Sequence, residues 1–179
     1  MNSTDEQLRY PIGKFSPPQS YTQEVISASI KRIENLPSKI ESVFRSLSAE
    51  QLETPYREGG WTARQVLHHI ADSHMNAYIR IKWTLTEDSP TIKAYNEKLW
   101  AETPEIAEDP LISIALLKAL HVKFAALLSR IPASDRGRVF VHPETGKRIS
   151  IEQMITLYAW HGDHHLGHLN IIASKPNQS

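Results

Sequence analysis

The stretch of sequence that decides the fold lies near the C-terminus and reads Tyr158-Ala159-Trp160-His161-Gly162-Asp163-His164-His165-Leu166-Gly167-His168. Four of the nine histidines of the chain fall within eight residues of this stretch. The surrounding segment from Ile151 to Ala173 contains no proline and repeats its apolar residues at helical spacing, so it predicts a helix. Ser150, followed three residues later by Gln153, supplies a capping-box pattern at the start of that helix.

The four histidines share one face of this predicted helix. With His161 at zero, His164, His165 and His168 lie at roughly −60°, +40° and −20° on a helical wheel. The same face carries Met154, Leu157, Tyr158 and Ile172 and should therefore look into the core. Buried imidazoles without partners are costly, and a metal ion is the simplest partner for several of them. The pair at i, i+4 formed by His161 and His165 would grip one ion, and His164 with His168 is the rival pair.

Composition limits the classes of function. The chain has 179 residues, enough for a single domain over residues 1–179 with a sizeable core. Its 20 Lys and Arg residues balance its 20 Asp and Glu residues, which gives no electrostatic case for binding nucleic acid or an anionic membrane. The polar N-terminus and the lack of an apolar run near about 18 residues predict a cytoplasmic protein without a membrane span.

The chain has no cysteine. Disulfides and thiolate ligands from the chain are therefore excluded, and any metal must be held by His, Asp, Glu or water.

Three more long helices are predicted upstream. They span Tyr21 to Leu47, where Pro37 should kink or divide the helix, about Trp61 to Leu85, and Leu111 to Ile131. Residues 1–20 are predicted to form an extended arm, and residues 86–110 an irregular connection with a short helix over Tyr95–Ala101. Residues 138–151 suggest two short extended pieces around a turn at Pro143–Gly146. The fold class is therefore all-α, a four-helix bundle with long connections and an N-terminal arm.

The second predicted helix offers several candidate ligands. His68, His69 and His74 all qualify by residue type, and spacing does not choose among them. A polar strip beside His69 includes Gln65, Asp72, Asn76 and Arg80, and such a strip is either a solvent-facing surface or the wall of a polar pocket. Of the remaining histidines, His121 lies in an apolar stripe and is interpreted as a core residue, and His142 precedes a proline in a loop.

Two stretches resemble the YfiT group of the DinB-like family. The first is Gly59-Gly60-Trp61-Thr62-Ala63-Arg64-Gln65-Val66-Leu67-His68-His69-Ile70-Ala71-Asp72-Ser73-His74-Met75-Asn76, and the second is Trp160-His161-Gly162-Asp163-His164-His165. The N-terminal Tyr10-Pro11-Ile12-Gly13 is similar to the opening of the same group. The resemblance implies a four-helix bundle with one divalent metal ion per chain, zinc or alternatively nickel. Carried over by position, the three ligands implied are His69, His161 and His165.

The resemblance also implies partners and activity. It implies a homodimer that acts on a small-molecule substrate as a metal-dependent hydrolase, although some relatives resemble transferases that use a low-molecular-weight thiol such as bacillithiol. The polar strip would then face a pocket, which makes Gln65, Asn76 and Arg80 candidate substrate-binding residues. Arg80 would suit a carboxylate on such a thiol. His74, His164 and His168 would pack around the ligands or support them.

Two readings of function follow. In an enzyme, three neutral histidines leave a coordination position open for a nucleophile, as in catalytic zinc sites. In a metal-sensing or binding module, the same site would hold a metal or small ligand without turnover. Gly162 stands where HExxH metalloproteases carry their glutamate, so the general base must lie elsewhere. Asp72 is the preferred candidate, with Glu97 as an alternative, since Asp163 should point away from the ligands.

Overall fold

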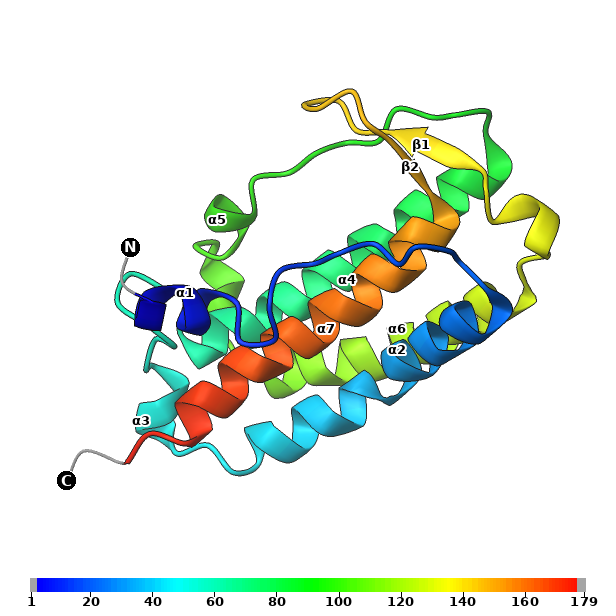
Figure 1. The fold of residues 1–179 in the computed structure, drawn as a ribbon. Coiled ribbons are helices and arrows are strands. Elements are labelled where there is room, and N and C mark those ends of the chain that lie inside the picture. Colours follow the sequence, from blue (N-terminus) through cyan, green and yellow to red (C-terminus); the bar gives the residue numbers. More distant parts are fainter. Residues whose placement is uncertain (1–2, 177–179) are drawn as a thin grey trace.

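In the computed structural model, which describes residues 3–176, four long helices form the body of the molecule (Figure 1). They are α2 (Gln23–Phe44), α4 (Ala63–Thr86), α6 (Leu111–Arg130) and α7 (Ile151–Ala173). Helices α2 and α4 each pack against both α6 and α7, which closes the bundle. The predicted four-helix bundle is confirmed, and the start of α7 is set by Ser150, whose hydroxyl accepts the backbone N–H of Gln153.

Short elements precede the first long helix or lie in the connections between the long helices. They are α1 (Ser3–Arg9), α3 (Ala49–Leu52), α5 (Glu97–Trp100), the 3-10 helices η1 (Pro104–Ala107) and η2 (Ala133–Asp135), and the strands β1 (Val139–Val141) and β2 (Arg148–Ser150). The strands pair antiparallel, with Phe140 opposite Ile149. Gly146 takes a positive φ of 64° in the turn between them, a conformation that glycine adopts without steric cost.

One expectation from the sequence was wrong, and one of the two outcomes expected at Pro37 is excluded. The N-terminal arm is not extended throughout, because residues 3–9 form helix α1, which is followed by a segment that crosses the outer face of α7 (Figure 1). Pro37 does not divide its helix, since α2 runs unbroken from Gln23 to Phe44 with Pro37 inside it. A proline costs such a helix one N–H donor, and tertiary packing on α6 and α7 outweighs that loss.

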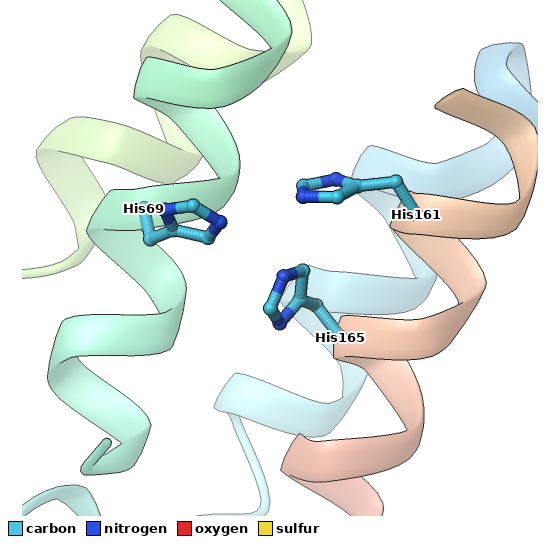
Figure 2. A group of neighbouring side chains, drawn as sticks. All are labelled: His69, His161 and His165. Atoms are coloured by element: carbon cyan, nitrogen blue, oxygen red, sulfur yellow. The ribbon is translucent and has the colours of Figure 1, made fainter. Parts of the chain in front are cut away.

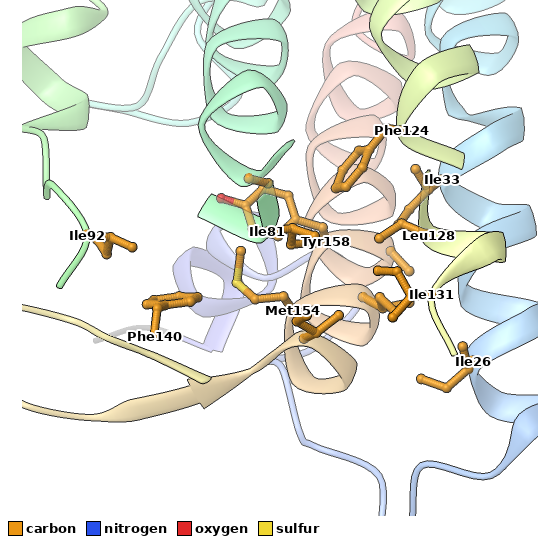
Figure 3. Close-up of a cluster of buried hydrophobic side chains, with 14 residues drawn as sticks. Ile26, Ile33, Ile81, Ile92, Phe124, Leu128, Ile131, Phe140, Met154 and Tyr158 are labelled. Carbon is orange, nitrogen blue, oxygen red and sulfur yellow. The ribbon is translucent and has the colours of Figure 1, made fainter. Parts of the chain in front are cut away.

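The core consists of two apolar clusters, one toward each end of the bundle. The first joins α2, α4, α6 and α7 to the β-hairpin through residues such as Phe124, Met154 and Phe140 (Figure 3). The second joins the other halves of the same helices through Leu36, Ile70, Leu117 and Leu169. The histidines of α4, α6 and α7 fall between these clusters, so a polar layer crosses an otherwise apolar core.

Helix α6 is long and apolar enough, by length and composition, to pass for a membrane span, unlike the other helices within residues 3–176. The sequence did not predict this. The core helix of a bundle passes the same test, and α6 packs against both α2 and α4.

Candidate metal centre

Three histidines converge in the gap between α4 and α7 (Figure 2). His69 comes from α4, and His161 and His165 come from successive turns of α7. One ring nitrogen from each lies within 4.8 Å of the others. A tetrahedral ion at the usual zinc–nitrogen length would bring such nitrogens to about 3.4 Å from one another, so modest side-chain rotations close the remaining gap.

The local sequence explains this convergence. His161 and His165 are four residues apart, so their rings lie on successive turns and meet edge to face, with centroids 4.5 Å apart. Thr62 and Gln65 form a capping box that fixes the first turn of α4, and the ring of Trp61 packs 4.5 Å from the ring of His69. The tryptophan and the helix start together set the position of His69 opposite α7.

His68 is directed elsewhere. Its Nδ1 lies 2.8 Å from the hydroxyl of Ser113 on α6, and its Nε2 lies 3.3 Å from the carbonyl of Glu108. Both ring nitrogens therefore have partners outside the cluster. The structure brings His69, and not His68, to the two histidines of α7, which is the choice that spacing left open.

The three clustered imidazoles are suited to a divalent ion because they are neutral. Burial lowers the pKa of His69 to about 4, and it holds the pKa values of His161 and His165 well below their usual value. Neighbouring histidines lower these pKa values further. A neutral imidazole offers a lone pair that zinc and nickel accept.

A rival group of three histidines is formed by His164, His165 and His168. Two of its nitrogens are already used on each other, because Nδ1 of His165 lies 3.3 Å from Nδ1 of His168. Nε2 of His168 lies 3.3 Å from the carbonyl oxygen of Arg9 in the N-terminal arm. This second group therefore consists of a hydrogen-bonded pair, His165 and His168, and of His164, whose ring stacks on Trp160.

Two further buried histidines extend the cluster across the bundle. Nδ1 of His161 lies 3.3 Å from Nε2 of His74, and Nδ1 of His74 lies 3.0 Å from Nε2 of His121. Sequence reasoning interpreted His121 as a core residue and His74 as a packing or supporting one, and it missed their direct contact. The available signal was the place of His121 in the middle of the apolar stripe of α6, where a polar residue needs a partner.

A solvent-open cavity of about 330 Å³ adjoins the cluster. His164, His165 and His168 line it together with Trp61 and Tyr56. Its charged lining residues are Arg9, Arg57, Glu97 and Lys98. A small molecule entering this cavity would meet aromatic rings and an excess of positive charge beside the edge of the cluster.

The predicted substrate-binding residues lie apart from this cavity wall. Gln65 uses both ends of its amide, accepting from the backbone N–H of Thr62 and donating to the carbonyl of Ala101. Asn76 donates to the carbonyl of Asp72 within α4. Arg80 donates to the carbonyl of Lys93 and lines a second cavity, of about 510 Å³, which shares Glu97 and Lys98 with the first.

The three acidic candidates for the general base, Asp72, Glu97 and Asp163, differ in their surroundings. Burial, with a smaller contribution from Glu105, raises the pKa of Asp72 to about 6. Desolvation also raises the pKa of Glu97. Asp163 points away from the ligands, as its place on the helical wheel predicts, and forms an ion pair of 2.8 Å with Nε of Arg32 on α2.

Both the sequence and the fold match those of known proteins. The model of the DinB superfamily matches residues 32–169. The chain belongs to the DinB superfamily. A solved structure titled "YfiT from Bacillus subtilis is a probable metal-dependent hydrolase with an unusual four-helix bundle topology" superposes with a TM-score of 0.90 at 43% identity, covering 93% of this chain and 95% of that one.

Curated relatives of this DinB-superfamily chain carry a similar description. Proteins of Bacillus cereus strain 03BB102 and Bacillus thuringiensis subsp. konkukian strain 97-27, each with the words "Putative metal-dependent hydrolase" in its name, are 45% identical over 170 residues. The match covers 95% of this chain and 98% of each relative. The resemblance to the YfiT group is thus confirmed, and the names together with the histidine cluster imply a metal.

Proposed function

We propose that this protein is a metal-dependent hydrolase of small molecules, with one divalent ion, zinc or alternatively nickel, held by His69, His161 and His165. The observation that carries the proposal is the convergence of three neutral imidazole nitrogens from two helices within 4.8 Å of one another. The names of the relatives support the same activity.

The donor set favours a reactive site over a structural one. Structural zinc sites are closed by four protein ligands, whereas three histidines leave a position open. A divalent ion bound here would supply Lewis acidity, which activates a coordinated water or thiol as a nucleophile. The chain supplies the neutral ligands, the cavity that admits a substrate and the aromatic wall formed by Trp61 and Tyr56.

Asp72 is the proposed general base. It follows His69 by three residues on α4, so the two side chains lie on neighbouring positions of one helix face. Its pKa of about 6 lies close to neutral pH, where a carboxylate is mostly ionised yet basic enough to take up a proton. Glu97, at the rim of the cavity, is the alternative.

A second candidate is S-transfer from a low-molecular-weight thiol such as bacillithiol. The chain has no cysteine, so a thiol must come from solution. The cations Arg9, Arg57 and Lys98 on the cavity wall favour a thiol that carries carboxylates. Arg80 lies in the adjoining cavity and could contact the far end of such a molecule.

One assay separates the candidates. The metal-loaded protein receives esters and amides without thiol, and an epoxide or haloarene with and without thiol. Ester or amide cleavage that a chelator abolishes supports the hydrolase. Turnover of the electrophile that requires thiol supports the transferase. Full metal occupancy without turnover in any arm would overturn both and leave a non-catalytic binding module.

The expected homodimer is also a proposal. Helix α6 exposes Leu111, Ile112, Leu116 and Val122, and Val122 is 72% and Ile112 60% accessible. Large apolar side chains grouped on one helix favour contact with a second copy. Light scattering would measure the molar mass of the wild type and of Val122→Lys. If the wild type is a dimer, the variant should be a monomer. A Val122→Lys variant that remains a dimer would exclude this face as the interface.

A further inference from the structure

Three histidines that are not ligands in the proposed site, His74, His121 and His168, join two of the ligands in two hydrogen-bond chains, and each chain ends on a backbone carbonyl. One runs from His161 through His74 and His121 to the carbonyl of Ile33. The other runs from His165 through His168 to the carbonyl of Arg9. A carbonyl only accepts, whereas a neutral imidazole has one donor and one acceptor nitrogen. Each chain therefore has a defined direction.

The first chain is fixed from its deep end. Nδ1 of His121 lies 2.6 Å from the carbonyl oxygen of Ile33, so this nitrogen must carry the proton. Nε2 of His121 is then an acceptor, and Nδ1 of His74 donates to it. Nε2 of His74 is in turn an acceptor, and Nδ1–H of His161 donates to it. Nε2 of His161 keeps its lone pair, which the hydroxyl of Ser73 approaches to 3.5 Å in the metal-free protein.

Pro37 explains why the carbonyl of Ile33 can accept from His121. In a regular α-helix, that carbonyl would accept the N–H of the residue four positions later, which is position 37. Proline has no N–H, so the helical bond at this position cannot form. The proline inside α2 thus leaves an acceptor directed at α6, and His121 occupies it.

The second chain is fixed by the N-terminal arm. Arg9 ends α1, and the carbonyls of the last helical turn take donors from outside the helix. Nε2–H of His168 donates to the carbonyl of Arg9, which makes Nδ1 of His168 an acceptor. Nδ1–H of His165 donates to it. Nε2 of His165 is again the nitrogen that keeps its lone pair.

We propose that His74, His121 and His168 are positioning residues that fix the tautomers of His161 and His165, so that both ligands present the lone pair of Nε2 to the metal ion. The inference rests on the proposed function, because the lone pairs are needed only if the site binds a metal ion. The tautomers themselves are properties of the metal-free protein and can be measured without the ion. It also assigns a single ion to the cluster, because Nδ1 of His165 carries the proton shared with His168 and has no lone pair for a second ion.

His74, His121 and His168 are buried, at 0%, 1% and 1% exposure, and burial in an apolar core favours the neutral imidazole. Without the chains, His161 and His165 would each populate both tautomers, and the form protonated at Nε2 cannot ligate through that atom. Groups that orient metal-ligating histidines are worth about 10- to 100-fold in metal affinity.

The first test is the tautomeric state of the metal-free wild type. Long-range ¹H–¹⁵N spectra distinguish the two neutral forms, and single substitutions assign the signals. We expect His161, His165, His74 and His121 protonated at Nδ1 and His168 protonated at Nε2. Protonation of His161 or His165 at Nε2 would overturn the proposal.

The second test is metal affinity, measured with Zn²⁺ by competition with a chelator. His74→Phe and His168→Phe each remove an acceptor, and affinity should fall about 10- to 100-fold. His74→Gln and His168→Asn place an amide oxygen near the lost nitrogen and should restore part of the affinity. His164→Phe is the matched control, since His164 belongs to neither chain, and it should stay close to wild type.

Equal affinities for His74→Phe, His168→Phe and His164→Phe would overturn the proposal, as would an absence of rescue by the amide variants. If a phenylalanine variant does not fold, the wild-type spectrum still decides the tautomers. If the wild-type protein binds no divalent ion, the proposed function is wrong. The spectrum of the metal-free protein would still show whether the two hydrogen-bond chains exist.

Discussion

His68 and His69 are neighbours in sequence, yet their rings reach different parts of the molecule. A step of about 100° around α4 separates them. That step sends His68 to Ser113 and the Glu108 carbonyl, and His69 to the histidines of α7. Residue type therefore does not distinguish these histidines, whereas position on the helix does.

The ligand assignment predicts a difference between adjacent histidines. Alanine at His69, His161 or His165 removes one of three donors, so metal content should fall well below one ion per chain. His164→Ala should keep most of the metal, because its ring stacks on Trp160 outside the proposed donor set. Elemental analysis of each purified variant checks this, and full retention of metal by His165→Ala would contradict the assignment.

Asp72→Asn tests the proposed general base. The amide has no basic oxygen, so kcat/KM should fall on the order of 10²–10⁴ while metal content stays unchanged. The limb of the wild-type pH–rate profile near pH 6 should disappear, since it reflects the raised pKa of this carboxyl. Asp163→Asn is the matched control, because it breaks only the ion pair with Arg32 and should leave turnover near wild type.

At the scale of elements, the close packing of α2 against α7 limits the size of the side chain that can follow His161 in the helix. A Cβ at Gly162 would overlap the side chain of Leu36, which is buried in α2. The position that holds a glutamate in HExxH helices therefore accepts a side chain only if Leu36 moves. A glutamate at this position would conflict with the packing of α2 on α7.

Gly162→Ala should destabilise the protein despite the better helix propensity of alanine. Overpacking costs about 1–3 kcal/mol, and replacing a helical glycine returns about 1 kcal/mol, so unfolding free energy should fall by up to about 2 kcal/mol. Urea denaturation of Gly162→Ala, Leu36→Ala and the double variant measures the coupling.

The double variant should be more stable than the sum of the single effects predicts, because Leu36→Ala vacates the space that the methyl group added by Gly162→Ala needs. Gly167→Ala is the control, since its Cβ would meet Pro11 of the N-terminal arm, which lies outside the bundle core. Strictly additive single effects would contradict the packing explanation.

At the scale of the whole molecule, the histidine layer lies between two apolar clusters and makes folding sensitive to pH. Burial lowers the pKa of His69, His121, His164 and His168 from 6.5 to about 4. Between these values the unfolded chain binds protons that the folded chain does not. Stability is therefore full above about pH 6.5 and falls as pH drops toward 4.

The metal-free protein should lose unfolding free energy on acidification from pH 7 to pH 5. Each such histidine contributes at most about 1.4 kcal/mol per pH unit inside the window. Asp72 acts in the opposite direction, because its raised pKa makes the folded state bind a proton between about 6 and 3.8, but it is one group against several.

Urea titrations at pH 7, 6 and 5 measure this slope. His164→Phe should reduce the slope by up to one proton, since the unfolded chain then has one fewer histidine to protonate. Stability that is flat or rising from pH 7 to pH 5 would contradict the buried neutral layer.

Much of the fold could be predicted because its signals are local. Apolar spacing and the Ser150 cap place α7 at Ile151–Ala173, as expected, and α6 ends one residue before the expected Ile131. The i, i+4 spacing of His161 and His165 sets their rings one above the other in any helix. The sequence by itself therefore determined the four long helices, their bundle and the shared face of His161 and His165 on α7.

The tertiary structure decided what depends on partners far apart in the chain. Spacing could not tell whether His68 or His69 faces α7, because that depends on where α7 packs. Nor could it show that Pro37 leaves the carbonyl of Ile33 open to His121, 88 residues away, since proline read locally only weakens a helix. Local geometry is encoded over a few residues, whereas the pairing of buried polar atoms is settled only when the helices meet.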